Sequence, residues 1–98
     1  MAARHRKPST IQIAGHAISI VPVDGLQAAE GLNGDWNEVR LRIRIDSSLT
    51  GSRRQEIILH ECIHAISTLN GLNLEESQVR TLGLGLQQML APALGKVA

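Results

Sequence analysis

Aromatic residues are nearly absent from this sequence, which contains no phenylalanine, no tyrosine and a single tryptophan, Trp36. Because aromatic rings bury the largest area per residue, a core for these 98 residues has to be built almost wholly from aliphatic side chains. The single cysteine, Cys62, excludes an intramolecular disulfide. A domain this small therefore needs another source of stability, which can be a metal ion, a partner chain or very close helix packing.

Long apolar runs and a dominant charge are also missing. No apolar stretch reaches the length of a signal peptide or a membrane span, and the formal net charge is only +1. We therefore expect no membrane partner, and a single thiol is typical of the reducing cytoplasm. The basic residues from Arg4 to Lys7 are interpreted as part of a flexible N-terminal tail, residues 1–9, because short basic clusters at chain ends are usually solvated.

Alternating apolar and polar residues predict a small antiparallel sheet early in the chain. Isoleucine recurs at every second position on both sides of the Gly15-His16 turn, which is the pattern of a β-hairpin. Residues 23–37 lack a sustained period, so a loop or a short helical turn is expected there. A third strand is predicted over residues 39–45, where apolar residues alternate with arginines.

The three arginines of this third strand, Arg40, Arg42 and Arg44, share one face. The simplest interpretation is a solvent-exposed face of the sheet, and binding of an acidic substrate is the alternative. Together with the basic tail, the same face suits a nucleic-acid contact, which we expect least because isolated basic clusters predict such binding poorly. Trp36, just before this strand, is expected to fill the core rather than to line a cleft.

Two amphipathic helices are predicted in the second half of the chain, over about residues 53–69 and 73–90, the second ending before Pro92. The apolar face of the first helix consists of Ile58, Cys62, Ala65, Ile66 and Leu69. That of the second helix consists of Val79, Leu82, Leu86, Met89 and Leu90. The sequence thus predicts an α+β fold, a hairpin and a third strand packed on two helices, in one domain of residues 10–91 followed by a C-terminal tail, residues 92–98.

The first helix carries an HExxH motif that begins at His60 and ends at His64. Histidines four residues apart lie above one another on the same helix face, so both imidazoles can reach one zinc ion. Glu61 lies about 100° around the helix from His60, where a general base for a zinc-bound water belongs. Because the apolar face of this helix is on the other side, the motif is free of core packing. The sequence therefore predicts a zinc site with Glu61 as the catalytic base.

A catalytic zinc ion needs a third protein ligand and an open fourth position. The remaining histidines, His5 in the tail and His16 in the hairpin turn, have no interpretable spacing to the motif. The short turn after the first helix brings Glu75 and Glu76 back alongside it, so either can complete a His-His-Glu set. Glu76 can instead form a capping box with Asn73, and Glu75 lies nearer the centre of the apolar arc. The residues by themselves leave this choice open.

The HExxH motif followed after eleven residues by Glu76 resembles the compact gluzincins, the HExxH-plus-glutamate zinc peptidases that include thermolysin-like enzymes. The chain is similar in particular to the small phage and prophage proteins called minigluzincins, and more loosely to the ImmA/IrrE family. In that group the second helix tends to place a glutamate, a small apolar residue, a larger one, a tiny one and a leucine at fixed spacings. Here those positions are Glu76, Val79, Leu82, Gly83 and Leu86. The likeness is specific over residues 59–90 and only architectural before them.

This resemblance implies a minimal zincin-like domain that hydrolyses peptide bonds in a peptide or protein substrate, in the host cytoplasm if the gene is phage-encoded. It implies zinc as the cofactor, His60, His64 and Glu76 as its ligands, and Glu61 as the base. It also implies that Gly83 lets the two helices approach closely around the metal.

One part of the gluzincin pattern is missing, because larger members use a tyrosine or histidine to steady the oxyanion and this chain has no tyrosine. His16 or one of the three arginines is the candidate substitute, and the third strand can alternatively hold an extended peptide by strand addition. Loss of an oxyanion donor costs about 10²-fold or more in rate. Two hypotheses remain: a weak or specialised zinc metallopeptidase, and a non-catalytic zinc-stabilised binding or regulatory module.

Overall fold

The computed structural model describes the backbone of residues 7–97 and the side chains of residues 7–90, so most of the predicted basic tail lies outside the described residues. The predicted α+β class is confirmed. In chain order the elements are β1 (Ser9–Ile13), β2 (His16–Val23), α1 (Leu26–Glu30), β3 (Gly34–Asn37), β4 (Arg42–Asp46), α2 (Gly51–Leu69) and α3 (Glu76–Val97).

The sheet has four strands in the order β1-β2-β4-β3, and it is mixed rather than antiparallel. The hairpin β1-β2 and the pair β3-β4 are antiparallel, but β4 runs parallel to β2, with Ile43 opposite Ile20. The physical reason is β3, which the sequence analysis assigned to a loop. β3 runs in the direction opposite to β2. Because β4 is antiparallel to β3, it runs in the same direction as β2.

The third predicted strand begins three residues later than expected. Val39 is 93% exposed in the turn after β3, and Leu41 has a positive φ of 50°, so the chain is still turning at both positions. The hairpin turn is likewise one residue earlier than predicted, because Ala14 and Gly15 both have positive φ, as a two-residue type I′ turn requires.

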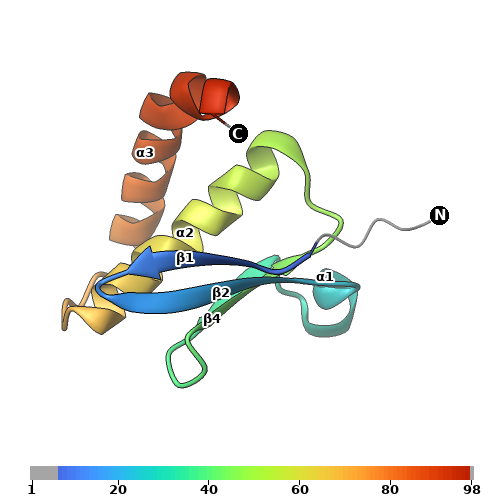
Figure 1. Ribbon diagram of the computed structural model, residues 1–98, viewed down its shortest axis with the longest axis horizontal. Coiled ribbons are helices and arrows are strands. Elements are labelled where there is room, and N and C mark those ends of the chain that lie inside the picture. Colours follow the sequence, from blue (N-terminus) through green and yellow to red (C-terminus); the bar gives the residue numbers. More distant parts are fainter. Residues whose placement is uncertain (1–6, 98) are drawn as a thin grey trace.

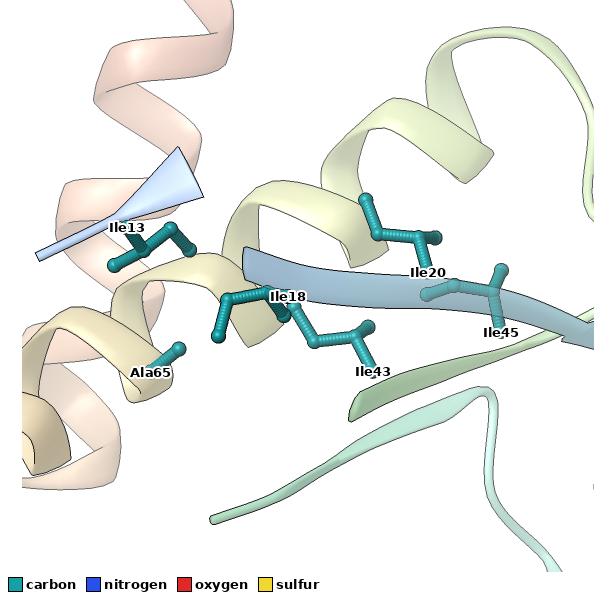
Figure 2. Close-up of a cluster of buried hydrophobic side chains, with 6 residues drawn as sticks. All are labelled: Ile13, Ile18, Ile20, Ile43, Ile45 and Ala65. Carbon is teal, nitrogen blue, oxygen red and sulfur yellow. The ribbon is translucent and has the colours of Figure 1, made fainter. Parts of the chain in front are cut away.

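One face of the sheet packs against α2 and forms the core (Figure 2). The fully packed cluster is aliphatic, as the shortage of aromatic rings demanded: Ile13, Ile18, Ile20, Ile43, Ile45 and Ala65. Trp36 and Cys62 pack against this cluster, so the prediction that both belong to the core is confirmed. The opposite face carries Arg44, whose side chain pairs with Glu30 of α1 and with Asp35 of β3.

α2 lies between the sheet and α3, and α3 stands on the outer side of α2, away from the strands (Figure 1). α3 continues through Pro92 to Val97, so the predicted helix end before this proline was wrong and residues 92–97 are helical. A proline removes one backbone hydrogen bond from a helix, which weakens the helix without always ending it. Within the described residues no helix is both long enough and apolar enough to cross a bilayer.

The predicted apolar faces of the two helices are only partly buried. In α2, Ile58 and Leu69 pack on the core as expected, but Ile66 is 42% exposed and Ile63 is buried in its place, against α3. Of the predicted apolar face of α3, Val79 is fully buried, while the other four residues are exposed: Leu82, Leu86, Met89 and Leu90. The reason is that α3 packs chiefly on α2, and one neighbouring helix covers only a narrow arc.

Candidate metal centre

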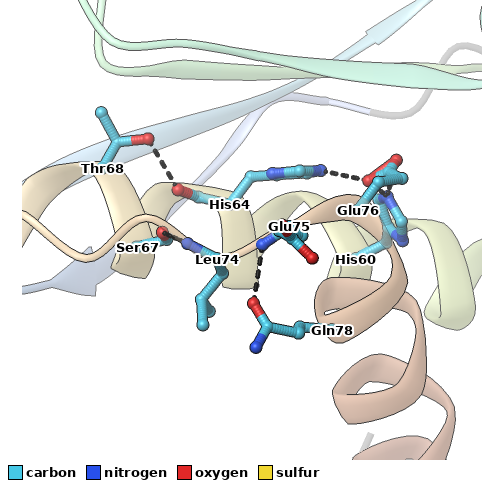
Figure 3. A network of polar contacts seen from close by, with 8 residues as sticks. All are labelled: His60, His64, Ser67, Thr68, Leu74, Glu75, Glu76 and Gln78. Atoms are coloured by element: carbon cyan, nitrogen blue, oxygen red, sulfur yellow. Dashed lines mark hydrogen bonds and ion pairs between the residues drawn. The ribbon is translucent and has the colours of Figure 1, made fainter.

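The two histidines of the HExxH motif and one glutamate of α3 meet in the structure (Figure 3). The Nε2 atom of His60 lies 3.1 Å from Oε1 of Glu76, and Nε2 of His64 lies 2.9 Å from the same oxygen. All three ligand-capable atoms lie within 4.8 Å of one another. Two imidazole nitrogens and one carboxylate oxygen form the donor set of a three-ligand zinc site with an open fourth position. The side chains present therefore fit a zinc ion.

Glu76 reaches the histidines because a buried serine holds the turn between the two helices. The hydroxyl of Ser67 donates to the carbonyl of Leu72 at 2.9 Å and accepts the N–H of Leu74 at 3.2 Å. Ser67 itself is only 5% exposed and lies one turn beyond His64 in α2. In the sequence, a serine on this side of the helix looks like an ordinary small residue. The sequence analysis therefore could not identify its role in positioning the turn.

Glu75, the alternative third ligand, lies elsewhere. Its backbone N–H donates to Oε1 of Gln78 at 2.8 Å, and this hydrogen bond caps the start of α3. Among the described residues, neither Glu75 nor His16 belongs to a group of ligand-capable side chains, and His5 lies outside the described residues. The structure therefore brings Glu76, and not Glu75, to the two histidines.

The electrostatics of Glu76 follow from these contacts. Desolvation by its surroundings works to raise the pKa of the Glu76 carboxyl, but the hydrogen bond to His64 and the charges of His60 and His64 outweigh it and lower the pKa. The side chain of Glu76 remains 55% exposed, and those of His60 and His64 are 22% and 31% exposed. The group is thus open to solvent on one side, as a site for an exchangeable ligand has to be.

Glu61 lies beside this group and is buried, with 8% of its surface exposed. Burial raises the pKa of its carboxyl to about 7, with smaller contributions in the same direction from the charges of Asp35 and Glu76, while the charge of His64 opposes the shift. A carboxyl that titrates near neutral pH can both accept and return a proton under physiological conditions. Its position beside His60 is the one that the motif predicted.

A cavity of about 250 Å³ lies next to the metal-binding group. Glu61, His60 and Glu76 form part of its wall, and Asn33 and Gly34 at the start of β3 form the side toward the sheet. β3 is the edge strand of the sheet at this side. The sequence analysis suggested that its third strand, which corresponds to β4, can bind an extended peptide along its edge. This was wrong, because β4 lies between β2 and β3 and has no free edge.

β3 can lie this close to α2 because it begins with a glycine. A Cβ atom on Gly34 would stand 2.8 Å from the carbonyl oxygen of Arg44 and 2.9 Å from Cγ2 of Ile57. Both separations are below any normal contact distance, so only glycine allows this approach. The Asn33-Gly34 pair was visible as a turn signal, but its role beside the cavity depends on tertiary packing.

None of the arginines proposed as oxyanion donors lines the cavity. Arg42 and Arg44 lie on the face of the sheet away from α2, and Arg40 is in the turn before β4. Two other arginines, Arg53 of α2 and Arg80 of α3, do line it. Arg53 is paired with Glu56, whereas Arg80 forms no ion pair with any described residue.

The sequence analysis did not identify Arg80 as a candidate site residue, because it belongs to no motif. The signal that was available is its spacing, since it follows Glu76 by four residues and therefore lies one turn further along the same face of α3. Once Glu76 is placed at the histidines, that spacing is enough to direct Arg80 toward the same cavity.

Comparison of the chain with family models, with curated protein sequences and with solved structures gave no significant match.

Proposed function

We propose that this protein is a zinc-dependent, gluzincin-type metallopeptidase in which His60, His64 and Glu76 hold the metal and Glu61 is the general base. The observation that carries the proposal is the meeting of His60, His64 and Glu76 beside a cavity that Glu61 also lines. A zinc ion bound there supplies a Lewis acid that polarises the substrate carbonyl and makes water more acidic. The protein itself has to supply the base, the substrate contacts and the stabilisation of developing negative charge.

Glu61 is suited to the role of base by its position. Its carboxyl is buried at the wall of the cavity, on the residue next to His60, so it can accept a proton from a water in the cavity and pass it to the leaving amine. Because little bulk water surrounds it, the proton stays with the reacting groups.

The substrate contacts are supplied by the edge strand and by Arg80. The unpaired edge of β3 can bind an extended peptide through backbone hydrogen bonds, since strand addition needs only a free edge. Arg80 lines the cavity without an ion-pair partner among the described residues, so it can contact a carbonyl or carboxylate oxygen of the bound peptide. In this proposal Arg80 takes the part of the tyrosine that the chain lacks, and the reaction takes place in the cytoplasm on a peptide or protein substrate.

The test is to replace Glu61 by glutamine. Glu61→Gln keeps the size of the side chain and removes the base, so zinc binding is retained and peptide hydrolysis falls by about 10²–10⁴-fold. Hydrolysis is measured with a mixture of fluorogenic peptides and bound zinc by elemental analysis. Glu56→Gln, in the same cavity and five residues earlier in α2, is the control and changes activity little. If Glu61→Gln hydrolyses the peptides as fast as the wild type, the proposed mechanism is wrong.

A non-catalytic module stabilised by zinc is the second candidate. It is favoured by the position of the metal-binding group, which joins α2 to α3, a helix that otherwise packs chiefly on α2. On this alternative the wild type hydrolyses none of the peptides and Glu61→Gln changes nothing measurable, while removal of zinc still destabilises the fold. The comparison of the wild type with Glu61→Gln therefore distinguishes the two candidates.

A further inference from the structure

We infer that the peptide substrate carries a carboxylate at or next to the bond that is cleaved, and that Arg80 binds this carboxylate. The inference rests on the proposed function, because it takes the ligand of the cavity beside the metal-binding group to be a peptide. It adds a specificity that the proposed reaction does not itself require, since a zinc ion and a general base act on the peptide bond whatever the neighbouring side chain is.

The wall of this cavity is polar. Among the described residues that line it, Ile57 is the only one with an apolar side chain. Pockets that select apolar groups are lined mostly by hydrophobic and aromatic side chains. The cavity volume of about 250 Å³ is also below the roughly 300–1,000 Å³ of pockets that enclose a drug-sized molecule. The cavity is therefore suited to one polar or charged group of the substrate.

The ion pairs in the wall decide which sign of charge is favoured. Nη1 of Arg53 lies 3.2 Å from Oε2 of Glu56, so these two charges offset each other. Glu76 belongs to the metal-binding group and Glu61 is the base beside it. This leaves Arg80 as a lining cation without an ion pair to any described residue. An unpaired guanidinium attracts an anionic group and repels the side chains of lysine and arginine.

Arg80 is close enough to the metal-binding group to contact the residues at the cleaved bond. It follows Glu76 by four residues in α3, which is a rise of about 6 Å along the helix axis. Side chains of a helix lean toward its N-terminal end, which here is the end with Glu76. Because an extended peptide advances about 3.3–3.6 Å per residue, Arg80 lies within about two residues of a carbonyl held at the metal-binding group.

Arginine suits a carboxylate because its planar guanidinium can donate two parallel hydrogen bonds to the two oxygens. The guanidinium has five N–H donors, so others remain for the oxyanion contact of the proposed reaction. The two contacts have different consequences. The oxyanion contact is the same for every peptide, whereas the carboxylate contact favours one peptide over another.

A peptide can supply the carboxylate from two sources, the side chain of an aspartate or glutamate and the free C-terminus. In the first case the protein cleaves within a chain beside an acidic residue, and in the second case it shortens the chain from its C-terminal end. Arg80 binds the same chemical group in both cases. Peptides that offer one carboxylate at a time therefore distinguish the sources.

The first measurement compares two pairs of peptides by their kcat/KM values. One pair is blocked at both ends and has glutamate or glutamine beside the cleaved bond, and the other has neutral side chains and ends in a carboxylate or an amide. Because Arg80 is exposed, we expect the wild type to favour the carboxylate member of at least one pair about fivefold or more. Arg80→Gln is expected to reduce this preference to about one, with its zinc content and circular dichroism spectrum unchanged.

Arg53→Gln is the matched control, since it removes the same charge from the same cavity at a side chain already paired with Glu56. It is expected to keep the preference for the carboxylate. If the wild type hydrolyses both members of each pair equally fast, the inference is overturned and the proposed function stands. An Arg80→Gln protein that keeps the preference also overturns it, as does an Arg53→Gln protein that loses the preference to the same extent.

The second measurement is binding without turnover. The zinc-loaded Glu61→Gln protein is titrated with the same four peptides by isothermal titration calorimetry, and we expect the carboxylate peptide to bind about fivefold more tightly or better. Adding Arg80→Gln to this protein is expected to remove the difference. If the wild type hydrolyses none of the peptides but the difference is present and depends on Arg80, the proposed function is wrong and the carboxylate recognition remains. A difference that is absent, or that persists without Arg80, overturns the inference.

Discussion

At the scale of single residues, one hydroxyl decides where the third metal-binding side chain lies. Ser67 is buried in α2, and its hydroxyl binds the backbone of the turn at two points: it donates to the carbonyl of Leu72 and accepts from the N–H of Leu74. The turn then delivers Glu76 rather than Glu75 to the histidines. The position of the candidate ligand thus depends on a residue that itself has no metal-binding chemistry.

Ser67→Ala is expected to destabilise the protein by about 1–3 kcal/mol, because it leaves a part-buried backbone carbonyl and N–H without their side-chain partner. It is also expected to weaken zinc binding by about 10–100-fold, the usual effect of losing a group that orients a ligand. Urea unfolding and zinc titration measure the two effects. Thr68→Ala is the control, since this neighbouring hydroxyl is exposed and bonds only to the carbonyl of His64. Equal zinc affinity in wild type and Ser67→Ala would contradict the positioning role.

At the scale of elements, two glycines lie where other segments approach α2, and only Gly34 is required for the approach. Gly34 lets β3 lie against the first half of the helix, and Gly83 lies against the backbone of His60 where α3 crosses it. The space around them differs. A Cβ on Gly34 would meet a backbone oxygen at 2.8 Å, whereas a Cβ on Gly83 would have its nearest neighbour, Cδ1 of Ile63, at 3.6 Å.

The same substitution is therefore expected to have opposite effects at the two positions. Gly34→Ala forces β3 away from α2 and is expected to cost about 1–3 kcal/mol, as overpacking does. Gly83→Ala is in ordinary contact and is expected to raise the free energy of unfolding by up to about 1 kcal/mol, because alanine favours a helix over glycine. Urea unfolding of both variants checks this pair. A destabilised Gly83→Ala protein would show that the helices are closer than the structure has them.

Asp46 joins the end of β4 to the start of α1 and makes the fold sensitive to acid. Hydrogen bonds from the Ser48 hydroxyl, the Gln27 N–H and the Ser48 N–H lower the pKa of its buried carboxyl. A carboxyl whose pKa is lower in the folded state stabilises the protein above its unfolded pKa of about 3.9, and this stabilisation is lost as the pH falls through the folded pKa.

In Asp46→Asn, one of the two carboxylate oxygens that accept hydrogen bonds is replaced by an amide NH₂ group, which cannot accept. The substitution is therefore expected to lower the free energy of unfolding by about 2 kcal/mol near pH 7. The difference between wild type and variant is expected to shrink as the pH falls from about 4 toward 2, because the wild-type carboxylate becomes protonated. Urea unfolding at a series of pH values measures it. A difference that stays constant down to pH 2 would rule out the contribution of the charge.

At the scale of the whole molecule, α3 is attached mainly by its contact with α2 and by the metal-binding group at its first residue. A metal held by His60, His64 and Glu76 would therefore join the outer helix to the body of the protein. Such a ligand binds only the folded chain and adds to its stability in proportion to the logarithm of its concentration over its dissociation constant.

Removal of zinc with a chelator is expected to lower the free energy of unfolding by about 4 kcal/mol if the free metal was at 1,000 times its dissociation constant. Thermal unfolding followed by circular dichroism measures this, with and without added zinc. Glu76→Ala is expected to lose most of the response to zinc, and Glu75→Ala, one residue away, is expected to keep it. Equal responses of these two variants would contradict the assignment of Glu76.

The sequence by itself determined the composition of the core, the placement of the HExxH motif on an amphipathic helix and the return of a second helix after a short turn. These are local properties, since helical periodicity and residue spacing act within a few turns of the chain. The same reasoning could not find β3, because a four-residue strand with one large apolar side chain has no measurable period. It also predicted that Ile66 is buried, whereas Ile63 is buried instead, since periodicity identifies an apolar arc of the helix and not the element that covers it.

Only the tertiary structure decided between Glu75 and Glu76, made the sheet mixed, and directed Arg80 rather than Arg44 to the cavity. Each of these depends on contacts between segments distant in the sequence: Ser67 with the turn, β3 with β4, and α3 with α2. The physical reason is that a side chain's neighbours across the fold are set by how whole elements pack, and a single turn of helix can carry two glutamates of which packing selects one.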